Sequence, residues 1–111
     1  KIFGNSTVTV AHSRTSNLEE LCLDSDLIIS AIGKPEFIKG DMIKKGSTII
    51  DVGITRVDDS SSHKGYRIAG DVDFNSVSSR VVFITPVPGG VGPMTIAMLL
   101  KNTLKASSLS D

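Results

Sequence analysis

The sequence predicts an α/β fold in which layers of helices pack on a mostly parallel sheet. Strand-like segments alternate with helical segments along the chain, as they do when helices connect parallel strands. One strand-like segment, residues 27–32, is almost continuously apolar, which is typical of a strand that helices cover on both faces. The 111 residues suffice for one small domain, so we expect a single unit over residues 1–111.

The first half of the chain predicts three strands and two helical turns. Residues 7–11 alternate β-branched side chains and predict a strand. Asn17 can cap a short helix whose first turn is acidic, and the strand at 27–32 follows it. Asp41 can cap a helical turn that ends at Gly46, after which residues 47–52 predict the third strand.

The second half predicts a hairpin, a strand and a long helix. Residues 54–58 and 66–72 are the expected hairpin arms, joined by a polar, flexible loop. Asn75 can cap a brief helix that reaches Arg80, and residues 81–85 predict a further strand. In residues 94–106 the apolar positions recur at helical spacing, which predicts a helix.

Composition excludes several classes of function. Twelve Lys and Arg balance twelve Asp and Glu without a basic block, so we expect no nucleic-acid partner. The apolar stretches are far shorter than the roughly 20 residues that span a bilayer, so we expect no membrane partner. A lone cysteine, Cys22, excludes an internal disulfide framework and favours a reducing intracellular compartment; we expect the cytoplasm and leave mitochondrion and plastid open.

Four predicted strand ends carry unusual residues: 12–15, 31–35, 51–54 and 85–90. Ligands of open α/β sheets bind beyond the carboxyl ends of the strands, so we expect these four segments to share one edge. Glycine there allows a backbone to approach a ligand closely; the alternative is that each is an ordinary turn glycine.

The end of the first predicted strand favours a phosphorylated dinucleotide. A carboxylate at this position binds the ribose hydroxyls of NAD, whereas an arginine accommodates the 2′-phosphate of NADP. Here Ser13, Arg14 and Thr15 provide a positive charge and hydroxyls without a carboxylate, which favours NADP. In the alternative interpretation Arg14 is a solvated loop charge.

Residues 86–93 contain three prolines and three glycines in eight positions. Proline fixes the backbone and glycine leaves its amides accessible, so this loop predicts a shaped ligand wall. The helix that follows, with the Thr95 hydroxyl near its start, can face a polar or anionic group. The alternative is a purely structural crossover.

Other polar residues carry weaker signals. His12 is expected to line a cofactor edge, and His63 to be solvated. Asp71 and Asp73 are expected to be exposed turn acids rather than a metal pair, so we assign no metal. Cys22 is expected to be a small buried thiol, and no catalytic dyad is apparent.

Five motifs together resemble the cofactor domain of the bifunctional methylenetetrahydrofolate dehydrogenase/cyclohydrolase family: residues 12–15, 32–35, 51–54, 70–72 and 85–95. The last is close to a signature, and the match spans nearly the whole chain in order. The resemblance implies a Rossmann-like three-layer fold and an enzyme that oxidises 5,10-methylenetetrahydrofolate with NADP and then hydrolyses the methenyl product to 10-formyltetrahydrofolate.

The resemblance also assigns residues. The implied cofactor-binding residues are His12, Ser13, Arg14, Ala31, Ile32, Gly33, Val52, Gly53, Ile54 and Thr95. The implied wall facing the folate comprises Pro88, Gly89, Gly90, Val91 and Gly92. The family's catalytic lysine and its partners belong to an N-terminal domain with no counterpart here, so no catalytic residue is assigned.

The resemblance further implies an incomplete domain. The family's cofactor domain opens with a strand and a Gly-rich phosphate loop, and too few residues precede position 7 to hold them. In the order 3-2-1-4-5 the missing strand would lie between the strands at 7–11 and 48–52. We therefore expect a fragment whose partners are the N-terminal part of the same enzyme and, in the intact enzyme, a second copy. Two alternatives remain: a module of another NADP-dependent oxidoreductase, and a non-catalytic α/β binding module.

Overall fold

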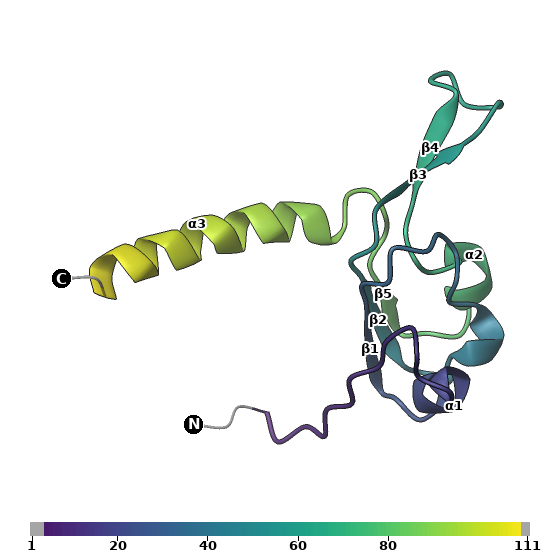
Figure 1. Cartoon of the computed structure of the whole chain (residues 1–111), viewed down its shortest axis with the longest axis horizontal. Helices are drawn as coiled ribbons and strands as arrows, with labels where there is room; N and C mark the ends of the chain where they lie inside the picture. Colours follow the sequence, from purple (N-terminus) through teal and green to yellow (C-terminus); the bar gives the residue numbers. More distant parts are fainter. Residues whose placement is uncertain (1–3, 110–111) are drawn as a thin grey trace.

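The computed structural model describes residues 4–109, which form short helices and strands around a small parallel sheet (Figure 1). In chain order the elements are α1 (Leu18–Leu23), β1 (Leu27–Ser30), the short 3-10 helix η1 (Gly40–Met42), β2 (Thr48–Asp51), β3 (Thr55–Asp58), β4 (Tyr66–Ala69), α2 (Phe74–Val77), β5 (Phe83–Ile84) and α3 (Val91–Leu109).

The main sheet has the strand order β1-β2-β5, and both strand pairs are parallel. Leu27 pairs with Thr48 and Ser30 with Asp51, so β1 and β2 end at the same level. This confirms the predicted α/β class and parallel sheet. It also brings the carboxyl ends of the strands to a common edge.

The core lies on one face of this sheet. Ile28, Ile49 and Ile84 are neighbours in register and pack against α1, η1 and α2. The opposite face exposes Leu27, Ile29 and Phe83 by 52%, 64% and 70%. Within residues 4–109 helices thus cover one face only, as Figure 1 shows, and the expectation of a third layer is not met in this part of the chain.

A hairpin of β3 and β4 projects from the sheet (Figure 1). Thr55 pairs with Ala69 and Asp58 with Tyr66 in antiparallel register, which confirms the predicted arms. The Arg56 guanidinium lies over the Tyr66 ring, 4.0 Å from its centroid. This contact joins the two strands of the hairpin on one of its faces.

The strand predicted at residues 7–11 is wrong. This segment lies outside both sheets, and Val8 and Val10 are 79% and 84% exposed. Its alternating β-branched residues favour an extended backbone, but a strand also requires a neighbouring strand to pair with.

The predicted place of a missing strand is also wrong. β2 pairs with β1 on one side and with β5 on the other, so no further strand fits beside residues 48–51, where the missing strand was expected. β1 and β5 are the two edge strands of this sheet, and on the outer side of β1 the N–H and C=O groups have no strand partner among residues 4–109.

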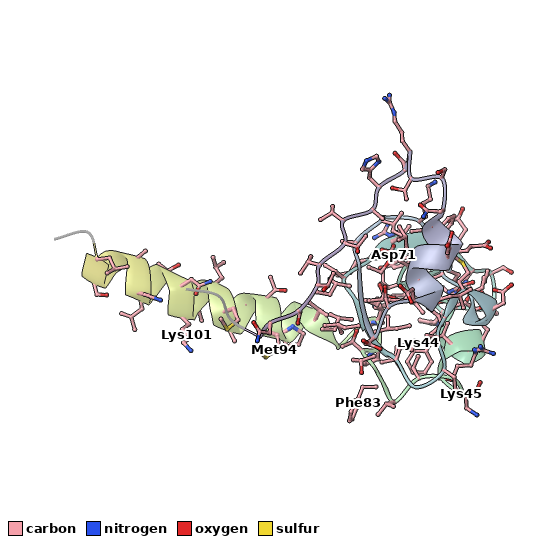
Figure 2. All side chains as sticks on the ribbon, turned by 90° about the horizontal axis from the view of Figure 1, so that it is seen from below. Lys44, Lys45, Asp71, Phe83, Met94 and Lys101 are labelled. Carbon is pink, nitrogen blue, oxygen red and sulfur yellow. The ribbon has the colours of Figure 1, made fainter. Side chains whose placement is uncertain are left out.

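α3 contains the helix predicted at 94–106 but extends away from the sheet (Figures 1 and 2). None of its described residues is buried, and Ile96, Leu99 and Leu100 are exposed. The apolar side chains that recur at helical spacing face solvent in this part of the protein. Among the described residues no helix combines the length and apolarity needed to cross a membrane.

Candidate functional site

The Asp71 carboxylate holds the chain segment that leaves β1. Asp71 follows β4 and is 0% exposed. Its Oδ2 accepts the Ile32 N–H at 2.6 Å and its Oδ1 accepts the Gly33 N–H at 3.0 Å. The Ser30 hydroxyl also donates to Oδ2, at 3.2 Å. One buried side chain thus holds three of the four residues from Ser30 to Gly33 at the end of β1.

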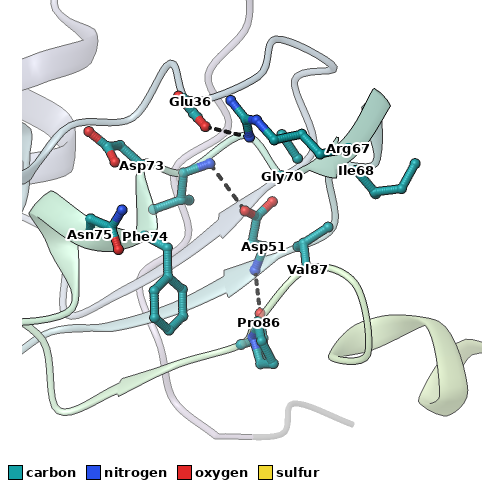
Figure 3. Close-up of a pocket in the computed structure, with 13 residues that line it drawn as sticks. Glu36, Asp51, Arg67, Ile68, Gly70, Asp73, Phe74, Asn75, Pro86 and Val87 are labelled. Atoms are coloured by element: carbon teal, nitrogen blue, oxygen red, sulfur yellow. Dashed lines mark hydrogen bonds and ion pairs between the residues drawn. The ribbon is translucent and has the colours of Figure 1, made fainter. Parts of the chain in front are cut away.

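Asp51, the last residue of β2, likewise accepts backbone N–H groups from the segments around it (Figure 3). Its Oδ1 accepts the N–H groups of Gly53 at 2.9 Å and Asp71 at 3.1 Å, and its Oδ2 accepts that of Val72 at 3.1 Å. Its own N–H donates to the Thr85 hydroxyl, just beyond β5, at 2.8 Å. Asp51 and Asp71 therefore link the ends of β1, β2 and β5, which we call the strand-end clamp.

Two glycines make room for the strand-end clamp. A Cβ on Gly53 would overlap the Asp71 carboxylate, and a Cβ on Gly70 would overlap that of Asp51. These glycines are thus required by the packing of the acids within the protein. Gly33 is different: its φ is +80° and the space around it is open, as a turn glycine requires.

The clamp leaves most of the predicted cofactor residues on the surface. Ala31, Ile32 and Gly33 beyond β1, and Val52 and Ile54 beyond β2, are exposed, whereas Gly53 is buried beneath them. The result is a largely apolar rim on a rigid, hydrogen-bonded base. Such a rim can receive a planar ring or a sugar without rearrangement of the backbone.

Residues 12–15 form a separate turn. The His12 N–H donates to the Thr15 hydroxyl at 2.9 Å, and His12 Nδ1 accepts the Arg14 N–H at 3.1 Å. Ser13 and Arg14 are exposed, so their hydroxyl and guanidinium are available to a ligand. The hydrogen bonds of this turn join its own residues, and the clamp does not include it.

The proline- and glycine-rich loop leads from β5 to α3. The Val87–Pro88 peptide is cis, Gly89 has a φ of +94°, and a Cβ on Gly90 would overlap the Pro86 carbonyl oxygen. In the predicted folate wall, Pro88, Gly89 and Gly92 are exposed and Gly90 and Val91 half-buried. The positive φ of Gly89 and the close approach at Gly90 are the two positions in this loop where glycine is required.

The hydroxyl of Thr95 is used inside α3. It donates to the Val91 carbonyl at 3.1 Å instead of pointing to a group beyond the helix start. A threonine hydroxyl in a helix commonly satisfies itself in this way when no ligand competes for it.

A cavity of about 320 Å³ lies between the hairpin base and the loop after β5 (Figure 3). Asp51, Gly70, Phe74 and Pro86 are among its lining residues. The Arg67 guanidinium on its wall donates to Glu36 at 2.8 Å. Sequence reasoning missed this cavity, because it joins segments that share no local pattern.

The expectation for Asp71 as an exposed turn acid is wrong. It is fully buried, and its partners lie 38 and 39 residues earlier, which no local pattern reveals. Asp73 is half-buried and pairs with Lys39 at 3.7 Å. Over residues 4–109 the structure contains no cluster of three or more His, Cys, Asp or Glu that could hold a metal ion.

The predictions for His63 and Cys22 are confirmed. His63 is exposed in the hairpin loop. Cys22 is a free, buried thiol whose pKa is raised, first by its burial and second by the negative charge of Glu19. A raised pKa disfavours the reactive thiolate, so the structure supports a packing role for Cys22.

The chain is similar to a known family and to several of its members. A sequence profile described as "Tetrahydrofolate dehydrogenase/cyclohydrolase, NAD(P)-binding domain" matches residues 2–111. The bifunctional protein FolD of Flavobacterium johnsoniae is 65% identical over 106 residues, which is 96% of this chain and 36% of that protein. FolD of Protochlamydia amoebophila is 64% identical over 108 residues, 97% of this chain and 37% of that protein.

Solved structures show the same likeness. The methylenetetrahydrofolate dehydrogenase-cyclohydrolase of Trypanosoma brucei, complexed with NADP cofactor and an inhibitor, matches 96% of this chain and 37% of its own with a TM-score of 0.83 and 47% identity. The bifunctional enzyme of Thermoplasma acidophilum matches 95% of this chain and 36% of its own, with a TM-score of 0.83 and 40% identity. The chain thus spans about a third of the length of these relatives. It belongs to the tetrahydrofolate dehydrogenase/cyclohydrolase family and matches that family's NAD(P)-binding domain.

Proposed function

We propose that this chain is the NADP-binding part of an enzyme that oxidises 5,10-methylenetetrahydrofolate to 5,10-methenyltetrahydrofolate and hydrolyses the product to 10-formyltetrahydrofolate. The observation that carries the proposal is the strand-end clamp. It holds the ends of β1, β2 and β5 on one edge and leaves Ile32, Val52 and Ile54 exposed there. Dinucleotides bind at this edge in open α/β sheets.

The residues present fit NADP. The exposed Arg14 guanidinium and Ser13 hydroxyl suit a 2′-phosphate, which carries a negative charge and several hydrogen-bond acceptors. The apolar rim of Ile32, Val52 and Ile54 suits the uncharged faces of a ring and its ribose. When bound, the nicotinamide would accept a hydride from the methylene carbon of the folate.

The folate itself is proposed to lie against the loop of residues 88–92. Its rigid path gives the exposed Pro88, Gly89 and Gly92 fixed positions, so they can exclude water from one side of the transferred hydride. We propose that the proton-transferring residues lie in the part of the enzyme that relatives possess and this chain does not cover, and that the intact enzyme is a homodimer in the cytoplasm.

A chimera tests this function. In the FolD protein of Flavobacterium johnsoniae, the segment that aligns with this chain is replaced by the chain itself. We expect the chimera to form NADPH, seen by its absorbance, when given NADP and 5,10-methylenetetrahydrofolate, and to release 10-formyltetrahydrofolate. A folded chimera without NADPH formation, next to an active parent FolD, would contradict the proposal.

A variant of the chimera tests the cofactor preference. Arg14→Gln keeps a polar side chain but removes the charge proposed to face the 2′-phosphate. We expect the KM for NADP to rise roughly tenfold because a charge-assisted hydrogen bond is lost, while kcat/KM with NAD stays the same. Equal effects on both cofactors would contradict a role of Arg14 at the 2′-phosphate.

Light scattering of the chimera tests the proposed homodimer, because it measures whether the molecular mass is that of one chain or of two.

A further inference from the structure

The segment that leaves β1 continues beyond the last bond of its sheet. The Val52 N–H donates to the Ser30 carbonyl at 2.8 Å, where the pairing of β1 with β2 ends. The next two N–H groups with a defined acceptor, those of Ile32 and Gly33, donate to the Asp71 carboxylate. A side chain thus serves where a neighbouring strand would otherwise supply carbonyl oxygens.

From this arrangement we propose that Asp71 is a positioning residue for the dinucleotide. It fixes the backbone of residues 31–33, whose outer surface the proposed function places against the cofactor, so this inference rests on that function. Asp71 does not itself contact the ligand: it is 0% exposed and both of its oxygens accept N–H groups of the protein.

Asp71 is itself held in place from several sides. Its N–H donates to Asp51 Oδ1 at 3.1 Å, and its carbonyl accepts the Ile38 N–H at 2.9 Å. Gly53 packs so closely on the Asp71 carboxylate that a Cβ there would overlap it. These contacts hold the carboxylate in place, and its two hydrogen bonds in turn hold the backbone of Ile32 and Gly33.

Preorganisation is the physical benefit. A ligand that binds a loop with several conformations must select one of them, which reduces its apparent affinity. With both N–H groups of the segment directed inward to Asp71, the exposed side of residues 31–33 is fixed before the dinucleotide arrives. Loss of the clamp should therefore weaken dinucleotide binding more than it slows the chemical step.

The test uses the chimera with Asp71→Asn. Asparagine has nearly the same shape, but one of its two polar atoms donates, so it would face an N–H with another N–H. We expect the KM for NADP to rise about tenfold, as loss of one hydrogen bond to a charged acceptor predicts. At saturating NADP we expect kcat within about twofold of the unsubstituted chimera and an unchanged KM for the folate.

A matched control separates positioning from stability. Val77→Ala removes buried volume from the core at α2 and takes away no hydrogen bond of the strand-end clamp, so it should lower the melting temperature without raising the KM for NADP. An Asp71→Asn variant that melts earlier yet keeps the KM for NADP of the unsubstituted chimera would overturn the proposal, because Asp71 would then only stabilise the fold.

Hydrogen exchange provides a readout that does not depend on catalysis. In Asp71→Asn we expect the amides of Ile32 and Gly33 to exchange faster while that of Ile49, in the middle of β2, does not change. If those two amides keep their protection, the proposal is overturned even where binding weakens. If the unsubstituted chimera binds NADP but oxidises no folate, the proposed reaction fails, whereas the rise in the dissociation constant for NADP still supports the positioning role.

A second variant applies if Asp71→Asn does not fold. Ser30→Ala removes one hydroxyl donor to Asp71 Oδ2 and leaves both N–H bonds possible. A carboxylate released on one side should allow more motion of residues 31–33, so we expect a rise of about two- to threefold in the KM for NADP. No rise in this folded variant would count against the proposal.

Discussion

The substitution Asp51→Asn in the 111-residue chain tests the strand-end clamp as a source of stability. Asp51 is buried and accepts N–H groups from Gly53, Asp71 and Val72. Asparagine can keep its oxygen on the side of two of these donors but then turns its NH2 group toward the third. One buried N–H loses its acceptor, which costs about 1–3 kcal/mol.

That cost is large for a domain of this size, whose total stability is on the order of 5–15 kcal/mol. With a urea m value of about 1.5 kcal/mol per M, a loss of about 2 kcal/mol lowers the urea midpoint by about 1.3 M. Unfolding can be followed by circular dichroism and by the fluorescence of Tyr66, because the chain has no tryptophan and no other tyrosine. The matched control is Asp58→Asn on exposed β3, where we expect a change below about 0.5 kcal/mol. Equal midpoints for the two variants would refute the structural role assigned to Asp51.

Three further predictions concern other parts of the chain. Gly70→Ala places a Cβ against the buried carboxylate of Asp51 and should lower the free energy of unfolding by more than about 3 kcal/mol. Gly92→Ala lies in open space on α3 and should raise helix stability by about 0.5–1 kcal/mol. Similar melting temperatures of the two variants in thermal unfolding would contradict this. The hydrogen bond from Lys44 lowers the pKa of Asp26 below its usual 3.8. The pair therefore stabilises the fold above about pH 4, and this contribution is lost as the pH falls through the lowered pKa. Asp26→Asn should be less stable than the unsubstituted chain at pH 7 and equally stable near pH 2, and a difference that persists in acid would argue against the pair. Because burial raises the pKa of the Cys22 thiol, iodoacetamide should modify it more slowly at pH 8 than a free cysteine, and urea should abolish the difference; rapid modification of the folded chain would show that the thiol is accessible.

The local elements were largely predictable from the sequence. Apolar runs predicted β1 and β2, and two short mixed segments around a polar loop predicted the hairpin of β3 and β4. These features depend on contacts between near neighbours or on burial along a whole strand, and both leave a periodic pattern in the sequence. The pattern does not identify a strand's neighbours, which explains the two errors at residues 7–11 and in the sheet order.

The strand ends that form the candidate site could be predicted in part from the sequence, but the hydrogen bonds that join them could not. The sequence indicated four strand ends, at residues 12–15, 31–35, 51–54 and 85–90. The structure links the last three through Asp51 and Asp71, whereas residues 12–15 form a separate turn. The acid at position 71 looked like a surface residue because its partners lie far away in the sequence. A glycine beside each acid, at positions 53 and 70, was the available signal, since a Cβ is excluded only where something packs against the backbone.

The isolation of α3 has a thermodynamic consequence. At 1.5 Å per residue its 19 residues form a rod about 28 Å long, and a helix of this length without tertiary contacts is only marginally stable in water. Its helix content would therefore rise when a surface covers the exposed side chains of Ile96, Leu99 and Leu100. Helix formation by α3 and its binding to such a surface would be one coupled equilibrium. The far-UV ellipticity of α3 would therefore measure the fraction of the protein that is bound.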